Sequence, residues 1–403
     1  MTSETFAAVP TETLGVYVHF PWCLKKCPYC DFLSLPAARD EIPHARYADA
    51  VIAELAARRA SLPDLPLRSI FFGGGTPSLW KADELGRVLA RILEAFPVHG
   101  PNLEITAECN PSSFDDTVAT GLARAGVNRI SLGVQSLDRE RLAFLGRLHD
   151  AAGALEALDV ATHHPFQRVS ADLIFGVAGE SPEAAKQEVE TLVERGITHL
   201  SAYALTIEPG TQFGELARRN RLPLLSDDAV ADSFAAVEGA LEARGFVHYE
   251  VSNYAKPGAE AQHNLGYWRG EPYVGIGAGA WGTLPIRDAR LRYRNTPSAE
   301  RYLGWAREPS GVDLEREGEF VAVTELLDGE TAFRERLMLG LRLAEGFDWR
   351  GSEARTGATM WTAARRRAFE KWSRRGALEE RDGRLHIERR HWLLADGIIA
   401  DLM

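Results

Sequence analysis

Three of the four cysteines in this 403-residue chain lie within eight residues of one another, as Cys23-x-x-x-Cys27-x-x-Cys30. Disulfide frameworks use an even, dispersed set of cysteines, so a close cluster indicates metal or redox chemistry instead. Structural zinc is normally closed by four ligands, and no further CxxC pair or paired histidines lie nearby. An iron–sulfur cluster on three thiolates leaves one iron open to an external small molecule. The spacing favours such a cluster, with zinc and chance occurrence as alternatives.

A glycine triplet, Gly73 to Gly75, follows an apolar run and precedes Thr76. Glycines allow a backbone to approach a ligand closely and to adopt positive φ. Taken alone, such a triplet more often marks a tight turn. Neither GxGxxG nor GxxxxGK[ST] occurs, so the common dinucleotide and nucleotide loops are not indicated.

The elements that must position these groups alternate between short apolar runs and helical patterns. We predict strands at 14–20, 69–72, 103–108, 129–132, 169–175 and 199–203. We predict helices at 47–60, 82–95, 114–125, in a stretch ending at 162, and at 182–195 and 227–244. Repeated βα units imply a parallel sheet. Six units predict an α/β fold, an incomplete (β/α)6 barrel, with a doubly wound open sheet as the alternative. In such barrels the chemistry lies at the carboxyl ends of the strands, where the motifs fall.

The pattern changes after a polar, turn-rich stretch at 292–308. We therefore predict one domain over 1–290, with the cysteine loop at 23–30, and a second over 291–403. Helices are expected at 331–343, 359–375 and 391–402, and a hairpin at 378–387 has Asp-Gly at its turn. These elements predict a small, winged-helix-like α+β domain.

Composition restricts the class of protein. A charge of −11 disfavours nucleic acid as a partner, because nucleic-acid binding depends on a positive field. No apolar run approaches the roughly 20 residues of a membrane-spanning helix. The first five residues are acidic and lack the apolar core of a signal peptide. We expect a cytoplasmic protein.

The cysteine loop, placed after the first strand of a βα barrel, resembles that of the radical S-adenosylmethionine (SAM) superfamily. Further motifs resemble its oxygen-independent coproporphyrinogen III oxidase group. They are Tyr17-Val18-His19-Phe20-Pro21-Trp22-Cys23, Gly73-Gly74-Gly75-Thr76-Pro77-Ser78, Glu108-Cys109-Asn110-Pro111, Gly133-Val134-Gln135-Ser136 and Asp172-Leu173-Ile174-Phe175-Gly176.

The resemblance implies a [4Fe-4S] cluster on the three cysteines, with SAM chelating the open iron. It implies SAM contacts from Tyr17, Tyr29, Gly73, Gly74, Gly75, Thr76, Glu108, Gln135, Arg147 and Asp172. Without that context, a lone glutamate at a strand end is more often a solvated rim residue, and a helix-surface arginine is the alternative for Arg147. The lone Cys109 is expected to be buried and structural.

Two departures separate the chain from the oxidases of the group. Those enzymes carry a further cysteine two residues after the third cluster ligand, where this chain has Phe32. They also carry a long N-terminal extension, whereas only 13 residues precede the first strand predicted here. Both departures match the HemW subgroup, which is regarded as a set of heme chaperones.

The segment His263-Asn264-Leu265-Gly266-Tyr267-Trp268 fits the HNxxYW motif of that subgroup. A neutral imidazole is a common axial ligand of heme iron, and Tyr267 and Trp268 offer flat apolar faces to a macrocycle. A histidine in a polar loop is otherwise a surface residue, and His19 is another candidate ligand. We therefore predict a heme site that includes His263, Asn264, Tyr267 and Trp268.

Two functions follow from the resemblance. The first is binding of heme and its transfer to respiratory proteins, as a monomer or a heme-linked dimer, with at most peripheral membrane contact. The second is oxidative decarboxylation of coproporphyrinogen III propionates with a 5′-deoxyadenosyl radical. Phe32 and the short N-terminal segment favour the first, which leaves enzymatic activity uncertain.

Overall fold

A twelve-stranded sheet organises the chain, which the computed structural model describes over residues 12–287, 289–307 and 312–403. Six neighbouring strands of this sheet run parallel in chain order. They are β1 (Leu14–Phe20), β4 (Leu67–Gly74), β5 (His99–Cys109), β6 (Arg129–Gln135), β7 (Arg168–Phe175) and β8 (His199–Ala204). Each contains one predicted strand, so the expected six βα units are confirmed.

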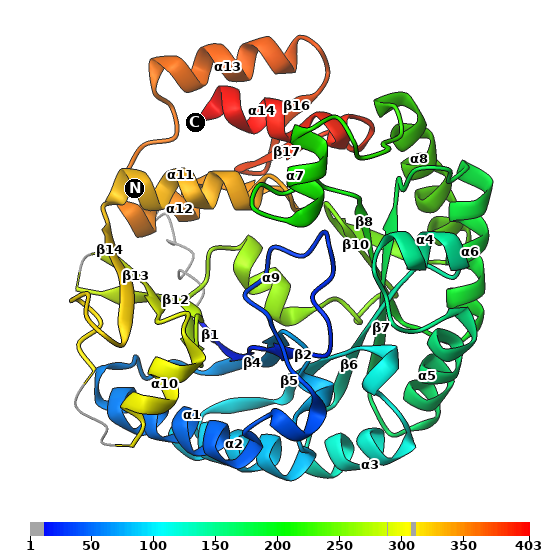
Figure 1. Ribbon diagram of the computed structural model, residues 1–403. Coiled ribbons are helices and arrows are strands. Elements are labelled where there is room, and N and C mark those ends of the chain that lie inside the picture. The colour runs from blue at the N-terminus through cyan, green and yellow to red at the C-terminus, as the bar shows by residue number, and fades with distance from the viewer. Residues whose placement is uncertain (1–11, 288, 308–311) are drawn as a thin grey trace.

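Helices cover the outer face of these strands, as Figure 1 shows. They are α1 (His44–Arg58), α2 (Ala82–Ala95), α3 (Asp116–Ala125), α4 (Arg139–Phe144), α5 (Ala151–His163), α6 (Pro182–Glu194) and α8 (Asp227–Ala243). Several begin where a side-chain oxygen accepts a backbone N–H, as at Asp115, Asp150 and Ser181. The stretch predicted to end at 162 is two helices, because Asp150 starts a second one.

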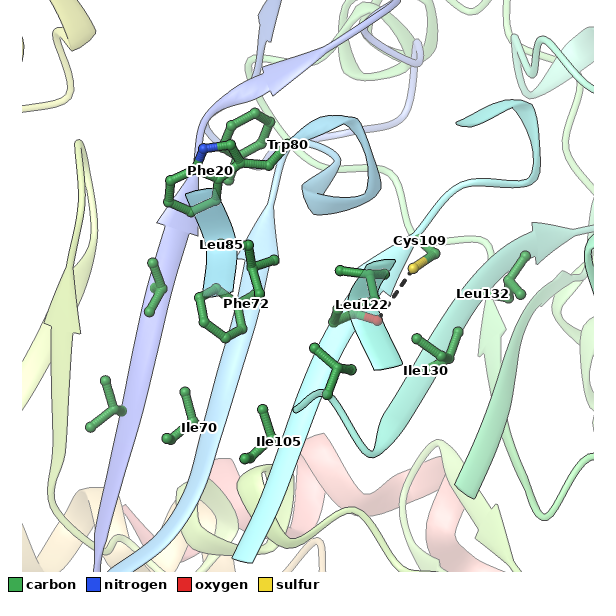
Figure 2. Close-up of a cluster of buried hydrophobic side chains, with 14 of the residues drawn as sticks. Phe20, Ile70, Phe72, Trp80, Leu85, Ile105, Cys109, Leu122, Ile130 and Leu132 are labelled. Atoms are coloured by element: carbon green, nitrogen blue, oxygen red, sulfur yellow. Dashed lines mark hydrogen bonds between the residues drawn. The ribbon is translucent and has the colours of Figure 1, made fainter. Parts of the chain in front are cut away.

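The main core fills the space between the strands and the outer helices. Figure 2 shows strand side chains such as Phe72 and Ile130 facing Leu85 of α2 and Leu122 of α3. Cys109 lies in the same layer, 5% exposed, with its Sγ 3.6 Å from the Ala107 carbonyl. The expected buried position of this lone cysteine is therefore confirmed.

Further strands extend the sheet at both edges. Beyond β8 lies β10 (Asn253–Ala255), which pairs antiparallel with β8, and then β9 (Val247–Glu250), which pairs antiparallel with β10. On the other side β11 (Tyr273–Ile276) pairs parallel to β1. It is followed across the sheet by β12 (Trp281–Ile286), β13 (Ala289–Asn295) and β14 (Val321–Leu327). The sheet is thus wider than the six strands predicted.

The stretch expected to be turn-rich, 292–308, differs from that prediction. It holds the end of β13 and a helix, α10 (Ala299–Trp305), and its last residue lies outside the described part. Asn295 is fully buried and donates to the Glu54 carboxylate and the Gly277 carbonyl, each across 2.8 Å. The division into 1–290 and 291–403 stays a prediction.

The last part of the chain has a hydrophobic cluster of its own, which includes Phe333, Leu337, Leu385 and Ile398. Its elements are α11 (Gly329–Gly340), β15 (Phe347–Asp348), α12 (Trp349–Thr356), α13 (Ala363–Ser373), β16 (Leu378–Arg381), β17 (Arg384–Ile387) and α14 (Ala395–Leu402). The hairpin turns at Asp382–Gly383, both with positive φ, as its sequence predicts. Among the described helices, none is long and apolar enough to cross a membrane.

Candidate functional site

The cysteine loop leaves β1 and is held at its two ends by backbone hydrogen bonds. Short strands β2 (Trp22–Cys23) and β3 (Leu35–Pro36) pair in parallel, and Ala37 N–H donates to the Cys23 carbonyl across 2.9 Å. Cys23, Cys27 and Cys30 all line one cavity of about 720 Å³ at the carboxyl ends of the strands. The fold thus brings the three predicted ligands to one site.

The thiols of this loop are free. Burial raises the pKa of the Cys23 and Cys30 thiols, neighbouring cysteines raise it further, and Lys26 opposes the shift. Over the described residues, no three His, Cys, Asp or Glu side chains converge on a single-ion site. A cluster spreads its thiolates over several irons and does not need them to converge on one point.

The glycine triplet lies against the cysteine loop at the end of β4. Gly74 has φ +112°, and a Cβ there would lie 2.5 Å from the His19 ring. A Cβ on Gly75 would lie 2.5 Å from the Trp22 carbonyl oxygen. Close packing thus requires glycine at both positions, and Gly74, Gly75 and Thr76 line the cavity.

Two carboxyl groups face the same cavity from neighbouring parts of the sheet, Glu108 on β5 and Asp172 on β7. Burial, and then the nearby Asp172 charge, raises the pKa of Glu108 to about 8. Burial also raises the pKa of Asp172, against a hydrogen bond from Ser131 across 3.2 Å. Both groups therefore favour a cationic ligand that would compensate their buried charge.

Arg147 connects this part of the cavity to the cysteine loop. Its Nη2 donates to the Gly133 carbonyl across 2.7 Å, while Nη1 lies 3.5 Å from Cys27 Sγ and 3.4 Å from the Tyr29 hydroxyl. Tyr29 and Gln135 also line the cavity, the latter with φ +68°. The predicted SAM residues, apart from Gly73 and Tyr17, are therefore assembled around one space.

Tyr17 and Gly73 lie beneath that space, in the barrel interior. The Tyr17 hydroxyl is 2.9 Å from His19 Nδ1, and His19 Nε2 is 2.9 Å from the Leu33 carbonyl on the cysteine loop. A Cβ on Gly73 would lie 2.9 Å from the Tyr17 ring. Tyr17 thus reaches the cysteine loop through His19, and the structure does not bring its side chain to the cavity wall.

His263 lies at the opposite end of the barrel, on the short helix α9 (Gln262–Trp268), which Figure 1 shows within the ring of strands. The ring is 1% exposed and stacks on Phe71. Its Nδ1 lies 2.9 Å from Ser69 Oγ, and its Nε2 lies 2.9 Å from the Tyr267 hydroxyl. Burial drives the pKa of His263 well below its usual range. In this conformation neither ring nitrogen is free to bind iron, so the placement does not support the predicted ligation.

The rest of that motif has separate surroundings. Asn264 is half-buried on α9, and Tyr267 packs edge-on against Tyr273. Trp268 lines a second cavity of about 260 Å³. Four arginines and four acidic residues share the wall of that cavity: Glu12, Arg269, Glu271, Arg336, Glu345, Asp348, Arg355 and Arg384.

Sequence reasoning missed the far wall of the large cavity. This wall includes Tyr203, Phe234, Ser252, Arg342, Trp392, Leu393 and Asp396. Tyr203 ends a predicted strand, so the rule that chemistry lies at strand ends could have found it. Arg342 and Trp392 carry no local signal, because only the packing of the C-terminal part against the barrel brings them there.

Comparison with known proteins agrees with this arrangement. Residues 17–192 match the radical SAM superfamily, and residues 327–394 match the HemN C-terminal domain. Heme chaperone HemW of Mycobacterium tuberculosis H37Rv is 36% identical over 98% of this chain and 96% of that protein. Heme chaperone HemW of Escherichia coli is 40% identical over 70% of this chain and 73% of that protein.

The coproporphyrinogen III oxidase HemN of Escherichia coli superimposes with a TM-score of 0.79 over 98% of this chain and 90% of that one. Its identity is 20%, so it shows the fold alone. The superfamily implies a [4Fe-4S] cluster and SAM as cofactors. The identities of 36% over 98% of the chain and 40% over 70% of it place this protein in the HemW family of the radical SAM superfamily.

Proposed function

We propose that this protein is a heme chaperone, which binds heme and passes it to heme-accepting respiratory proteins. The observation that carries the proposal is a match along almost the whole chain to a protein named heme chaperone HemW, with 36% identity over 398 residues. Phe32, in the position where the related oxidases carry a further cysteine, supports it. The resemblance further supports a cytoplasmic location and a monomer or heme-linked dimer, both of which stay predictions.

We assign the [4Fe-4S] cluster to Cys23, Cys27 and Cys30. A cluster of this kind supplies one-electron chemistry when bound. Gly74, Gly75 and Thr76 supply backbone beside the cysteines, and Glu108 and Asp172 supply carboxylates for a cationic ligand such as SAM. Arg147 offers a guanidinium to a ligand carboxylate in the same space.

A pair of cysteine variants tests the cluster assignment. Cys27→Ala should lose iron and sulfide after anaerobic reconstitution, because one of three thiolates is missing. Cys109→Ala is the matched control. Cys109 lies in the core layer and not on the cysteine loop, so this variant should retain the cluster. Equal iron content in the two variants would sink the assignment.

The alternative is oxidation of coproporphyrinogen III. The cavity has room for such a substrate, since about 720 Å³ is within the range of roughly 300–1,000 Å³ typical of small-molecule sites. The replacement of the extra cysteine by Phe32 disfavours it.

One anaerobic experiment separates the two functions. Reconstituted protein is given coproporphyrinogen III, SAM and a reductant, decarboxylated product is measured, and a parallel sample is titrated with heme. Saturable, near-stoichiometric heme binding without turnover supports the chaperone. Turnover to protoporphyrinogen would overturn it and make Phe32 an uninformative difference.

A further inference from the structure

The large cavity has two chemically different sides. The side formed by the cysteines, Glu108, Arg147 and Asp172 is accounted for by the cluster and SAM. The opposite side, the far wall, joins the end of β8 to the C-terminal part of the chain and is assigned to nothing so far. It includes Tyr203, Phe234, Ser252, Arg342, Trp392, Leu393 and Asp396.

Large apolar side chains gather around this cavity although water reaches them. Leu393 is 55% exposed, Tyr203 is 41% exposed, and Phe32 on the cysteine loop is 65% exposed. Single exposed apolar residues are ordinary, but a group of them around one concave space marks a binding site. An apolar ligand that covered them would gain the free energy of removing this surface from water.

A cation shares the cavity with these apolar side chains. Arg342 lines the cavity and lies 2.6 Å from the Asp396 carboxylate, and the Asp396 side chain is 89% exposed. A guanidinium binds carboxylates through paired, charge-assisted hydrogen bonds. A ligand carboxylate could therefore take the place of the Asp396 carboxylate on Arg342.

We propose that heme binds against the far wall, with its macrocycle on Tyr203 and Leu393 and one propionate carboxylate on Arg342. This inference rests on the proposed chaperone function and gives the cargo a place in the structure. A flat apolar ring that carries carboxylates at its edge matches apolar side chains next to one cation. The second cavity, which includes Trp268, is smaller at about 260 Å³.

The far wall also differs from a permanent heme site. No histidine is among the described residues that line the large cavity. Heme held there would lack the strong imidazole ligand of many heme proteins, which suits a cargo that must be released.

Neighbouring leucines provide a matched test on the full-length, cluster-reconstituted protein. Leu393→Asp places a charge on the far wall and should weaken heme binding about tenfold, measured by absorption titration. Leu394→Asp is the control, because Leu394 is 50% exposed next to it in the chain but does not line the cavity. Equal affinities of the two variants would overturn the site.

Substitutions of the two partners of the ion pair should change the affinity for heme in opposite directions. Arg342→Gln should weaken heme binding several-fold, whereas Asp396→Asn should strengthen it by removing the competing carboxylate. The difference between wild type and Arg342→Gln should vanish with heme dimethyl ester, whose propionates are blocked. A persistent difference with the ester, or no difference with heme, contradicts the proposed propionate contact.

Failure of the site and failure of the proposed function are distinguishable. If the wild-type protein binds heme and every variant binds it equally, heme binds elsewhere and this inference is wrong. If the wild-type protein itself does not bind heme, the chaperone function is overturned and the cargo site with it.

Discussion

The Nη1 of Arg147 lies 3.5 Å from the Sγ of Cys27, so a guanidinium contacts a thiol that we assign to the cluster. A positive charge and a hydrogen bond at the sulfur both stabilise the added electron of a reduced cluster. We expect Arg147→Gln to lower the reduction potential on the order of tens of millivolts. Arg147→Lys should keep the reduction potential close to that of the wild type, because lysine retains the positive charge.

An EPR-monitored potentiometric titration of the reconstituted protein measures this effect. Cluster content must be equal in the three proteins for the comparison to hold. The same potential in Arg147→Gln as in the wild type would show that the arginine serves only ligand binding.

Glu108 should make the stability of the SAM-free protein depend on pH. Its pKa is about 8 in the folded protein because of burial, against 4.5 when exposed. The folded state thus binds the proton more tightly, and the contribution of Glu108 is lost as the pH rises from 4.5 to 8. The free energy of unfolding should fall by up to about 1.4 kcal/mol per pH unit in this range.

Denaturant unfolding at several pH values, for wild type and Glu108→Gln, measures that contribution. The variant should gain relative stability as the pH rises, because its amide does not ionise. Parallel pH profiles for the two proteins would show that Glu108 has an ordinary pKa in solution.

His263 should be important for stability rather than for iron. His263→Ala leaves a void under the barrel and removes the partners of Ser69 and Tyr267. A loss of about 2–4 kcal/mol in the free energy of unfolding is expected. The heme spectrum and affinity of the folded variant should be unchanged, and a lost heme spectrum would restore His263 as a ligand.

A substitution at Gly75 should disturb the cysteine loop. The Cβ of an alanine would lie 2.5 Å from the Trp22 carbonyl, so the backbone next to Cys23 must move. Cluster incorporation should fall in Gly75→Ala, measured as iron per chain. Gly239→Ala on α8 is the control: its Cβ meets nothing within 4 Å, so it should be neutral or stabilising by up to about 1 kcal/mol.

The sequence allowed the barrel to be predicted because its strands are short apolar runs that alternate with helical patterns. The run at 69–72, for example, lies within β4, and the glycines that follow it, Gly73 and Gly74, mark the end of that strand. The cysteine loop and the strand-end groups could be predicted together, since carboxyl ends of parallel strands meet at one edge.

Other elements depend on contacts that a single chain pattern does not contain. Helix α9 has only seven residues. The backbone N–H groups of Gln262 and His263 at its start donate to the Glu104 carboxylate, which is 158 residues before Gln262 in the chain. Strand β13 did carry a signal: Arg290, Arg292 and Arg294 alternate with buried Leu291 and Tyr293. The turn-forming residues that follow concealed this period of two.

Helix α9 has a kinetic consequence, because it lies across one end of the barrel and leaves ligands to arrive from the other. A molecule that occupies the deepest part of such a space must enter before anything binds nearer the mouth, and must leave after it. Loading and unloading should then follow a compulsory order, with the last ligand in being the first one out. The depth at which each ligand binds would in this way set the order in which the ligands are released.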